Sequence, residues 1–176
     1  MGPMGVLGSF LSSFSGSFKA AMILWPFLSF LFTMPILAFL YHRDGRLRFS
    51  QALAAYCSVL YLAGLACFTL YPLPSGESGP GITYGIPPQF NPFNFILDIM
   101  KDGWKALFQT VFNVVLFIPL GFIAHRFLQM RLLPTIILSL ITTCLIETAQ
   151  LTGLFGIYPY AYRTFEVDDI IFNTLG

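Results

Sequence analysis

Charged residues are scarce in this chain. Asp, Glu, Lys and Arg together make up 10% of the 176 residues, whereas hydrophobic residues make up 56%. A soluble domain has about 25% charged residues, so the composition indicates an integral membrane protein. The net charge is +1 and no basic patch with interleaved aromatic residues is present, so we expect no nucleic-acid partner.

Cysteine and histidine are few and scattered. Cys57, Cys67 and Cys144 lie inside apolar runs without metal-ligand spacing, as is typical of small buried hydrophobic residues. His42 and His125 each precede an arginine, and neither stands beside a Ser or Cys that could act as a nucleophile. There is also no Gly-rich phosphate loop. The sequence therefore predicts no metal site and no cofactor.

Long apolar runs predict membrane-spanning helices, because about 20 apolar residues cross the hydrocarbon core of a bilayer. The runs cover about residues 20–41, 50–71, 106–124 and 133–152. A fifth run begins near Val167 and is cut off at Gly176, which is too short to span as a helix. The predicted fold is therefore all-α: a polytopic transmembrane helical bundle of about five helices, with the last truncated at Gly176.

The predicted organisation is one transmembrane domain over residues 20–176, preceded by an arm. Residues 1–19 are rich in Gly, Ser and Phe and lack a signal peptide's features, so we expect an interfacial or disordered N-terminal arm. In the loop 72–105, residues 72–88 are rich in Pro, Gly and Ser and should lack regular structure. Residues 89–105 have the apolar spacing of a short helix at the membrane interface.

Arginines in short loops predict the orientation, because Lys and Arg concentrate in cytoplasmic loops. The loop 42–49 has three arginines and the loop 125–132 has two, so both are expected in the cytoplasm. The loop 72–105 has two lysines against three acidic residues and is expected outside. The chain is then a multi-pass protein of the cell membrane with its N-terminus outside.

One carboxylate lies where acids are costly. Glu147 stands inside the apolar run 133–152, where an acid costs roughly 2.5–3.5 kcal/mol on insertion scales. It should therefore face protein or a water-filled cavity and find polar partners. Gln150 is three residues further along, on the same helix face. Asn113 offers a second polar side chain inside another apolar run.

Helical spacing predicts that several of these side chains meet in the outer leaflet. At a rise of 1.5 Å per residue, Asn113 and Glu147 lie about 8–10 Å below the outer ends of their helices. Asp169 and Asn173 lie at a similar depth in the fifth segment. Glu166 shares a helix face with these two residues, and Asp168 points away from that face.

The nearby cation and the acids also have simpler explanations. Arg163 could bridge two carboxylates or bind an anionic group of a ligand. Glu147 and Gln150 could equally serve only to hold helices together, and Asn113 could be a packing hydrogen bonder. The pair Asp168 and Asp169 could be no more than a favourable charge at a helix start. The residues alone leave these alternatives open.

Three motifs in a fixed order carry a family resemblance. They read Asn113…Pro119-x-Gly121, then Glu147-x-x-Gln150, then Arg163…Asp169…Asn173-x-x-Gly176. The stretch 91–95, with its Asn and Phe residues, adds a weaker fourth. Together they resemble the VanZ-like family over about residues 55–176. The first span, 20–41, looks like an addition to the usual arrangement.

The resemblance implies a bacterial membrane protein whose namesake lowers susceptibility to the glycopeptide antibiotic teicoplanin. It implies no defined reaction. The positions that match the family's motifs and form the candidate ligand-binding site are Asn113, Glu147, Gln150, Arg163, Glu166, Asp169 and Asn173. Glu166 stands where the family often has Asp, which keeps the charge and lengthens the reach.

Two functions follow as hypotheses. In the first, the protein binds a membrane lipid, a lipid-linked envelope molecule or the glycopeptide itself, with Arg163 meeting an anionic group. In the second, it is an intramembrane enzyme on a lipid-linked phosphate or glycolipid, with Glu147 and Asp169 as the catalytic acid and base or as metal ligands. Whether the chain is an enzyme stays open, because no nucleophile motif is present. The absence of an internal repeat argues against a transporter.

The orientation can be tested by cysteine labelling of intact cells. In a variant whose three native cysteines are replaced by serine, Ser75→Cys should react with a membrane-impermeant maleimide. Gly45→Cys should react only after the cells are opened, because the arginine bias places its loop inside. The reverse pattern of labelling would show that the orientation is inverted.

Overall fold

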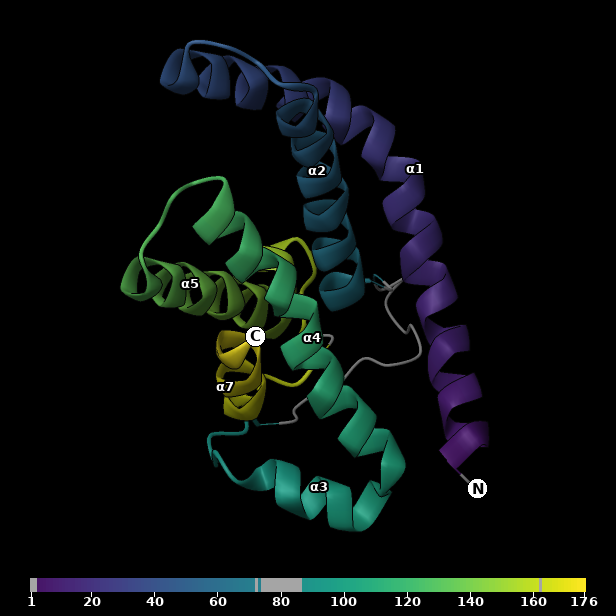
Figure 1. Cartoon of the computed structure of the whole chain (residues 1–176). Coiled ribbons are helices and arrows are strands. Elements are labelled where there is room, and N and C mark those ends of the chain that lie inside the picture. The colour runs from purple at the N-terminus through teal and green to yellow at the C-terminus, as the bar shows by residue number, and fades with distance from the viewer. Residues whose placement is uncertain (1–2, 72, 74–86, 162) are drawn as a thin grey trace. The chain divides into compact units, whose positions relative to one another are not determined.

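The computed structural model describes residues 3–71, 73, 87–161 and 163–176 (Figure 1). All regular structure in these residues is helical, apart from an isolated bridge between Gln89 and Glu166. The helices are α1 (Pro3–Asp44), α2 (Phe49–Leu70), α3 (Asn94–Asp102), α4 (Trp104–Arg126), α5 (Leu132–Leu151), α6 (Gly153–Gly156) and α7 (Val167–Leu175). The prediction of an all-α fold is confirmed.

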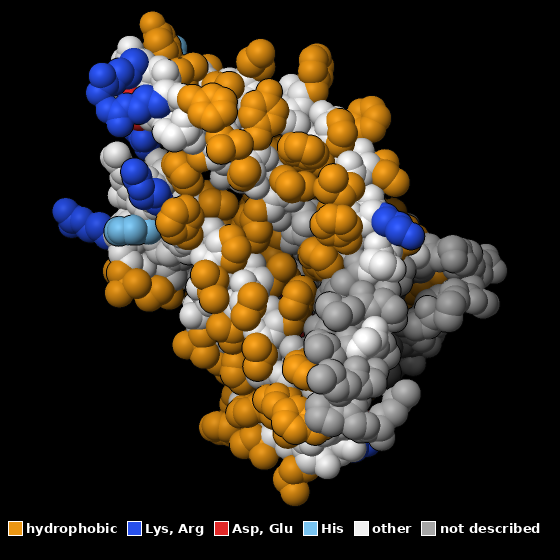
Figure 2. Space-filling view, turned by 45° about the vertical axis from the view of Figure 1, so that its right-hand side comes forward, with side chains coloured by type: hydrophobic (Ala, Val, Ile, Leu, Met, Phe, Trp, Pro, Cys, Tyr) orange, Lys and Arg blue, Asp and Glu red, His pale blue; other side chains and the backbone are white. Residues whose placement is uncertain are grey.

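In the described part of the chain, four helices are long and apolar enough to cross a membrane. They are Ser15–Asp44 within α1, then α2, α4 and α5, and each matches one of the four predicted runs to within a few residues. Many large hydrophobic side chains of these helices are exposed on the surface of the protein, and Figure 2 shows hydrophobic side chains over much of the visible face. A surface of this kind is stable in lipid, so the chain is a membrane-embedded helical protein. The fifth segment is helical from Val167, as expected, over nine residues.

The N-terminal segment is part of the first helix. Residues Pro3 to Lys19 are helical and continue into the first span as α1. The Gly and Ser residues of this segment alternate with Phe and Leu, and nothing in Pro3–Lys19 forces a helix to stop. The interfacial or disordered arm over residues 1–19 stays a prediction.

Contacts divide the chain into two compact units, Ser12–Pro72 and Leu73–Gly176, the second grouped with Met1–Leu11. In the first unit, α2 buries a row of mostly small side chains at every fourth position: Ala55, Val59, Ala63 and Cys67. In α1, Ser29 and Thr33 are buried and share a hydrogen bond of 3.0 Å between their hydroxyls. These polar groups thereby find a partner within their own helix.

In the second unit, α7 packs against both α4 and α5. Phe117 and Ala124 of α4 are fully buried. A side chain at Gly176 would overlap the carbonyl oxygen of Val114, and a Cβ at Gly121 would lie 3.6 Å from the carbonyl oxygen of Gly176. The last turn of α7 therefore approaches the backbone of α4 directly, which two glycines permit.

The segment that precedes α3, described from residue 87 onward, is tied to the start of α7. The backbone N–H of Gln89 donates to the carbonyl of Phe165 at 2.8 Å, and the N–H of Val167 donates to the carbonyl of Gln89 at 3.0 Å. The short helix expected within residues 89–105 is α3. The expectation for residues 72–88 falls mostly on residues 72 and 74–86, outside the described part.

A glycine is required where α5 turns into the loop that precedes α7. Gly153 has φ +62°, and a Cβ there would lie 2.5 Å from the carbonyl oxygens of both Tyr158 and Tyr160. Gly156, three residues on, also has positive φ (+88°) but has open space around it. A side chain at either glycine would be strained by the positive φ, but only a side chain at Gly153 would also overlap neighbouring atoms.

We expect Gly153→Ala to destabilise the protein clearly more than Gly156→Ala. Both substitutions place a side chain at positive φ, which costs about 1–2 kcal/mol. At Gly153 the added methyl also collides with backbone, which adds about 1–3 kcal/mol. Thermal unfolding in detergent measures the difference, and equal losses for the two variants would contradict the crowding at Gly153.

Candidate ligand site at the start of α7

The site is built around the first turns of α7. Glu166 precedes the helix in an extended conformation (φ −130°, ψ 123°), and Asp168 and Asp169 lie in the first turn. Acidic side chains are favoured there, because the N-terminal end of a helix carries a partial positive charge. The sequence therefore places three acids in four positions at one end of one helix.

Asp169 connects α7 to α4. Its Oδ1 accepts a hydrogen bond of 2.5 Å from the Nδ2 of Asn113, a residue 56 positions earlier. These two side chains are among the four that helical depth predicted to meet, with Glu147 and Asn173. In an apolar surrounding each would otherwise be an unsatisfied polar group, so the bond favours this docking of α7 on α4.

Asn173 connects α7 to α5. Its Nδ2 donates to the hydroxyl of Thr143 at 2.9 Å, and the hydroxyl of Ser139 donates to the carbonyl of Asn173 at 3.2 Å. Sequence reasoning missed Ser139 and Thr143. Their spacing was the available signal, because Ser139, Thr143 and Glu147 follow one another at four-residue intervals along one face of α5.

Glu147 is part of the same buried network. Its side chain is 1% exposed, and its Oε2 accepts a hydrogen bond of 3.1 Å from the backbone N–H of Glu166. Arg163 lies near enough to attract both Glu147 and Asp169 electrostatically. Gln150 is buried on α5 as well. Glu147 therefore faces protein, as its cost in lipid required, and it fixes the segment just before α7.

Asp168 turns toward α3, away from the face that Asp169 and Asn173 share. Its Oδ2 accepts a 2.7 Å hydrogen bond from the backbone N–H of Phe95. The side chain is buried, and its Oδ1 has no hydrogen-bond partner among the described residues. Asp168 thus joins α3 to α7, in addition to the backbone bonds at Gln89.

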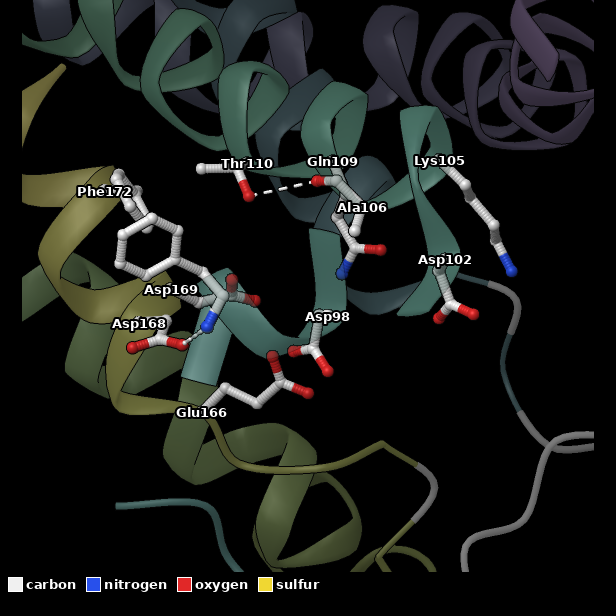
Figure 3. Close-up of a pocket in the computed structure, with 11 residues that line it drawn as sticks. Asp98, Asp102, Lys105, Ala106, Gln109, Thr110, Glu166, Asp168, Asp169 and Phe172 are labelled. Carbon is white, nitrogen blue, oxygen red and sulfur yellow. Dashed lines mark hydrogen bonds between the residues drawn. The ribbon is translucent and has the colours of Figure 1, made fainter. Parts of the chain in front are cut away.

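A cavity of about 200 Å³ lies between α3, α4 and α7. Figure 3 shows Asp98 of α3 and Glu166 directed toward the same space. The lining contains five acids and one lysine: Asp98, Asp102, Glu166, Asp168, Asp169 and Lys105. The remaining lining residues are Phe95, Ala106, Gln109, Thr110 and Phe172.

The cavity and the predicted site overlap only in part. Glu166 and Asp169 line the cavity, whereas the other five predicted residues, Asn113, Glu147, Gln150, Arg163 and Asn173, are not among its lining residues. Sequence reasoning missed Asp98 and Asp102 of α3 as contributors. Their signal was the four-residue spacing of Asn94, Asp98 and Asp102, which places three polar side chains on one side of a short helix.

The electrostatics of the cavity favour positive charge. Burial first, and then the neighbouring carboxylates of Asp169, Asp98 and Asp168, raise the pKa of the Glu166 carboxyl from its usual 4.5 to about 7. No three His, Cys, Asp or Glu side chains in the described part of the chain are grouped as metal ligands. The five carboxyl groups of the lining suit a group that donates several hydrogen bonds and carries positive charge, such as an ammonium.

Stability should fall as pH rises through the titration of Glu166. A folded-state pKa of about 7, above the ordinary value, means that the folded protein favours the neutral carboxyl. The contribution of Glu166 to the free energy of unfolding is therefore fully present below pH about 4.5 and is lost as pH rises through about 7. We expect the unfolding temperature in detergent to drop between pH 5.5 and 8.

The variant Glu166→Gln supplies the control for this pH dependence. It keeps the shape of the side chain and removes its titration, so its unfolding temperature should exceed that of the parent at pH 8 and vary less with pH. A parent protein that becomes more stable as pH rises over this interval would contradict the assignment.

Comparison with known proteins identifies the family. The sequence model described as VanZ/LLP1 matches residues 58–176, which is more than half of the chain and includes α3 to α7 with every residue of the predicted site. No curated protein and no solved structure gives a significant match. The matched range begins inside α2, so α1 lies outside it. This membrane-embedded chain belongs to the VanZ/LLP1 family.

Proposed function

We propose that this protein is a bacterial cell-envelope protein that contributes to tolerance of the glycopeptide teicoplanin by binding an amphiphilic, positively charged ligand. Family membership supports the link to glycopeptide resistance. The single observation that carries the binding proposal is the acidic cavity between α3, α4 and α7.

The lining of the cavity matches the chemistry of such a ligand. Carboxylates accept hydrogen bonds and bring negative charge, and Lys105 offsets only one of the five acids. Phe95 and Phe172, whose rings meet edge to face at 5.1 Å, give the same cavity an apolar wall. An ammonium group with an attached apolar portion would satisfy both parts.

The buried network has a positioning role in this proposal. Asn113 holds Asp169 by hydrogen bond, and Glu147 holds the backbone of Glu166. These two contacts position Asp169 and Glu166, the two acids that belong to both the buried network and the lining of the cavity. Arg163 attracts Glu147 and Asp169 electrostatically. In this proposal Arg163 therefore offsets the negative charge of these two carboxylates and does not bind an anionic group of the ligand.

The enzyme alternative has weaker support. It requires Glu147 and Asp169 to act on one substrate, yet Asp169 lines the cavity and Glu147 is a buried side chain outside its lining. A general base must come within hydrogen-bond reach of the group it deprotonates. Glu147 instead accepts a hydrogen bond from the chain's own backbone, so we favour binding.

Removing one charge from the cavity wall tests the proposal. In a glycopeptide-susceptible bacterium without a VanZ-like protein, expression of the parent should raise the inhibitory concentration of teicoplanin several-fold. Asp98→Asn should abolish most of that gain, because asparagine keeps the shape of the side chain and removes the charge that attracts a cation. Immunoblotting of membranes checks that the variant accumulates.

Lys101→Gln is the matched control. Lys101 is exposed on the same helix and does not line the cavity, so this variant should protect like the parent. If Asp98→Asn accumulates in the membrane and protects as well as the parent, the cavity charge plays no part in tolerance. If both variants accumulate and both lose protection, the outer surface of α3 is responsible and the cavity proposal is wrong.

A further inference from the structure

Helix α3 has two chemically different faces. Its polar side carries Asn94, Asp98 and Asp102, of which the two acids line the cavity. The opposite stripe is apolar and strongly exposed at Ile96 (47%), Leu97 (57%) and Met100 (80%), and the N-cap residue Phe93 (65%) precedes it by one turn. This spacing lies along one face of a helix and is typical of a helix at a membrane interface.

The stripe continues onto a surface that faces lipid. Trp104, which is 50% exposed, is the first residue of α4, and α4 is one of the four described helices that are long and apolar enough to cross a membrane. Farther along α4, exposed apolar side chains recur at Val111, Val115, Ile118 and Phe122, all at least half exposed. Gly103, with φ +60°, separates the two helices, and Figure 1 shows α3 lying across the end of α4.

The open side of the cavity lies at the same end of α4. Asp102 and Lys105 line the cavity and are themselves exposed, whereas Asp168 on the inner side is buried. Both exposed residues flank the turn at Gly103. A ligand therefore reaches the cavity past the junction of α3 and α4, next to the apolar stripe.

We infer that α3 lies in the boundary between lipid headgroups and acyl chains, with its apolar stripe in the lipid. In this position the cavity opens into the headgroup layer, and its ligand enters sideways from the bilayer. The ligand is then the ammonium-bearing headgroup of a membrane lipid. The identity of the ligand rests on the proposed function, whereas the depth of α3 does not.

A tryptophan on the apolar stripe makes the depth of α3 measurable. The variant Trp25→Phe/Trp104→Phe/Met100→Trp carries its sole tryptophan on α3, because Trp25 and Trp104 are the two tryptophans of the chain. After reconstitution into vesicles, its fluorescence should be quenched more strongly by lipids brominated near the headgroup than by lipids brominated near the chain end. Lack of quenching by either lipid overturns the inference, because another segment or a second copy of the chain would then cover the stripe.

A second measurement identifies the source of the ligand. Unfolding of the detergent-solubilised full chain is followed with phosphatidylethanolamine, with phosphatidylglycerol, or with free ethanolamine at the same concentration. We expect phosphatidylethanolamine alone to raise the unfolding temperature of the parent, and to lose this effect in Asp98→Asn while keeping it in Lys101→Gln.

The outcomes separate the two proposals. Equal stabilisation by free ethanolamine would overturn entry from the bilayer and would leave the charge-based proposal standing. Stabilisation by phosphatidylglycerol as strong as that by phosphatidylethanolamine would overturn the assignment of a cationic headgroup. If no ligand stabilises the parent while the tryptophan introduced by Met100→Trp is quenched at headgroup depth, the proposed function fails and the placement of α3 holds.

Discussion

The architecture of the second unit depends on polar side chains that hold α7 between two membrane helices. Asp169 bonds to Asn113 on one side and Asn173 bonds to Thr143 on the other. Apolar packing alone gives little directional preference in lipid, because lipid tails are as apolar as leucine. These two hydrogen bonds therefore specify where α7 sits, and the position of α7 in turn places Glu166 and Asp168 against α3.

Much of the fold could be predicted from the sequence because the signals were local. Each span is a long and mostly apolar run, and the meeting of Asn113 with Asp169 followed from their depths along helices of known rise. The cavity could not be predicted in the same way. Asp98 and Asp102 become part of the cavity only because a loop brings α3 against the start of α7. This contact between distant segments produces no periodic pattern in the sequence.

The role of Glu147 shows a second limit of sequence reasoning. A carboxylate in an apolar run indicates a function, since its cost in lipid demands a compensating partner. The partner is a backbone N–H, that of Glu166, which carries no side-chain signature in the sequence. The pattern identified a residue that needs a partner and could not tell a ligand-facing acid from one that fixes a neighbouring loop.

The pairing of Gln89 with the strand-like segment before α7 has a consequence for how this architecture varies among related chains. Both of its hydrogen bonds join backbone groups, from Gln89 to Phe165 and from Val167 to Gln89. Most side chains at position 89 would preserve them, and only a proline, which lacks the N–H, would remove one. The link between the segment before α3 and the start of α7 can therefore persist while the residues that form it change freely. A structural contact at the edge of the site would then produce almost no conserved position in an alignment.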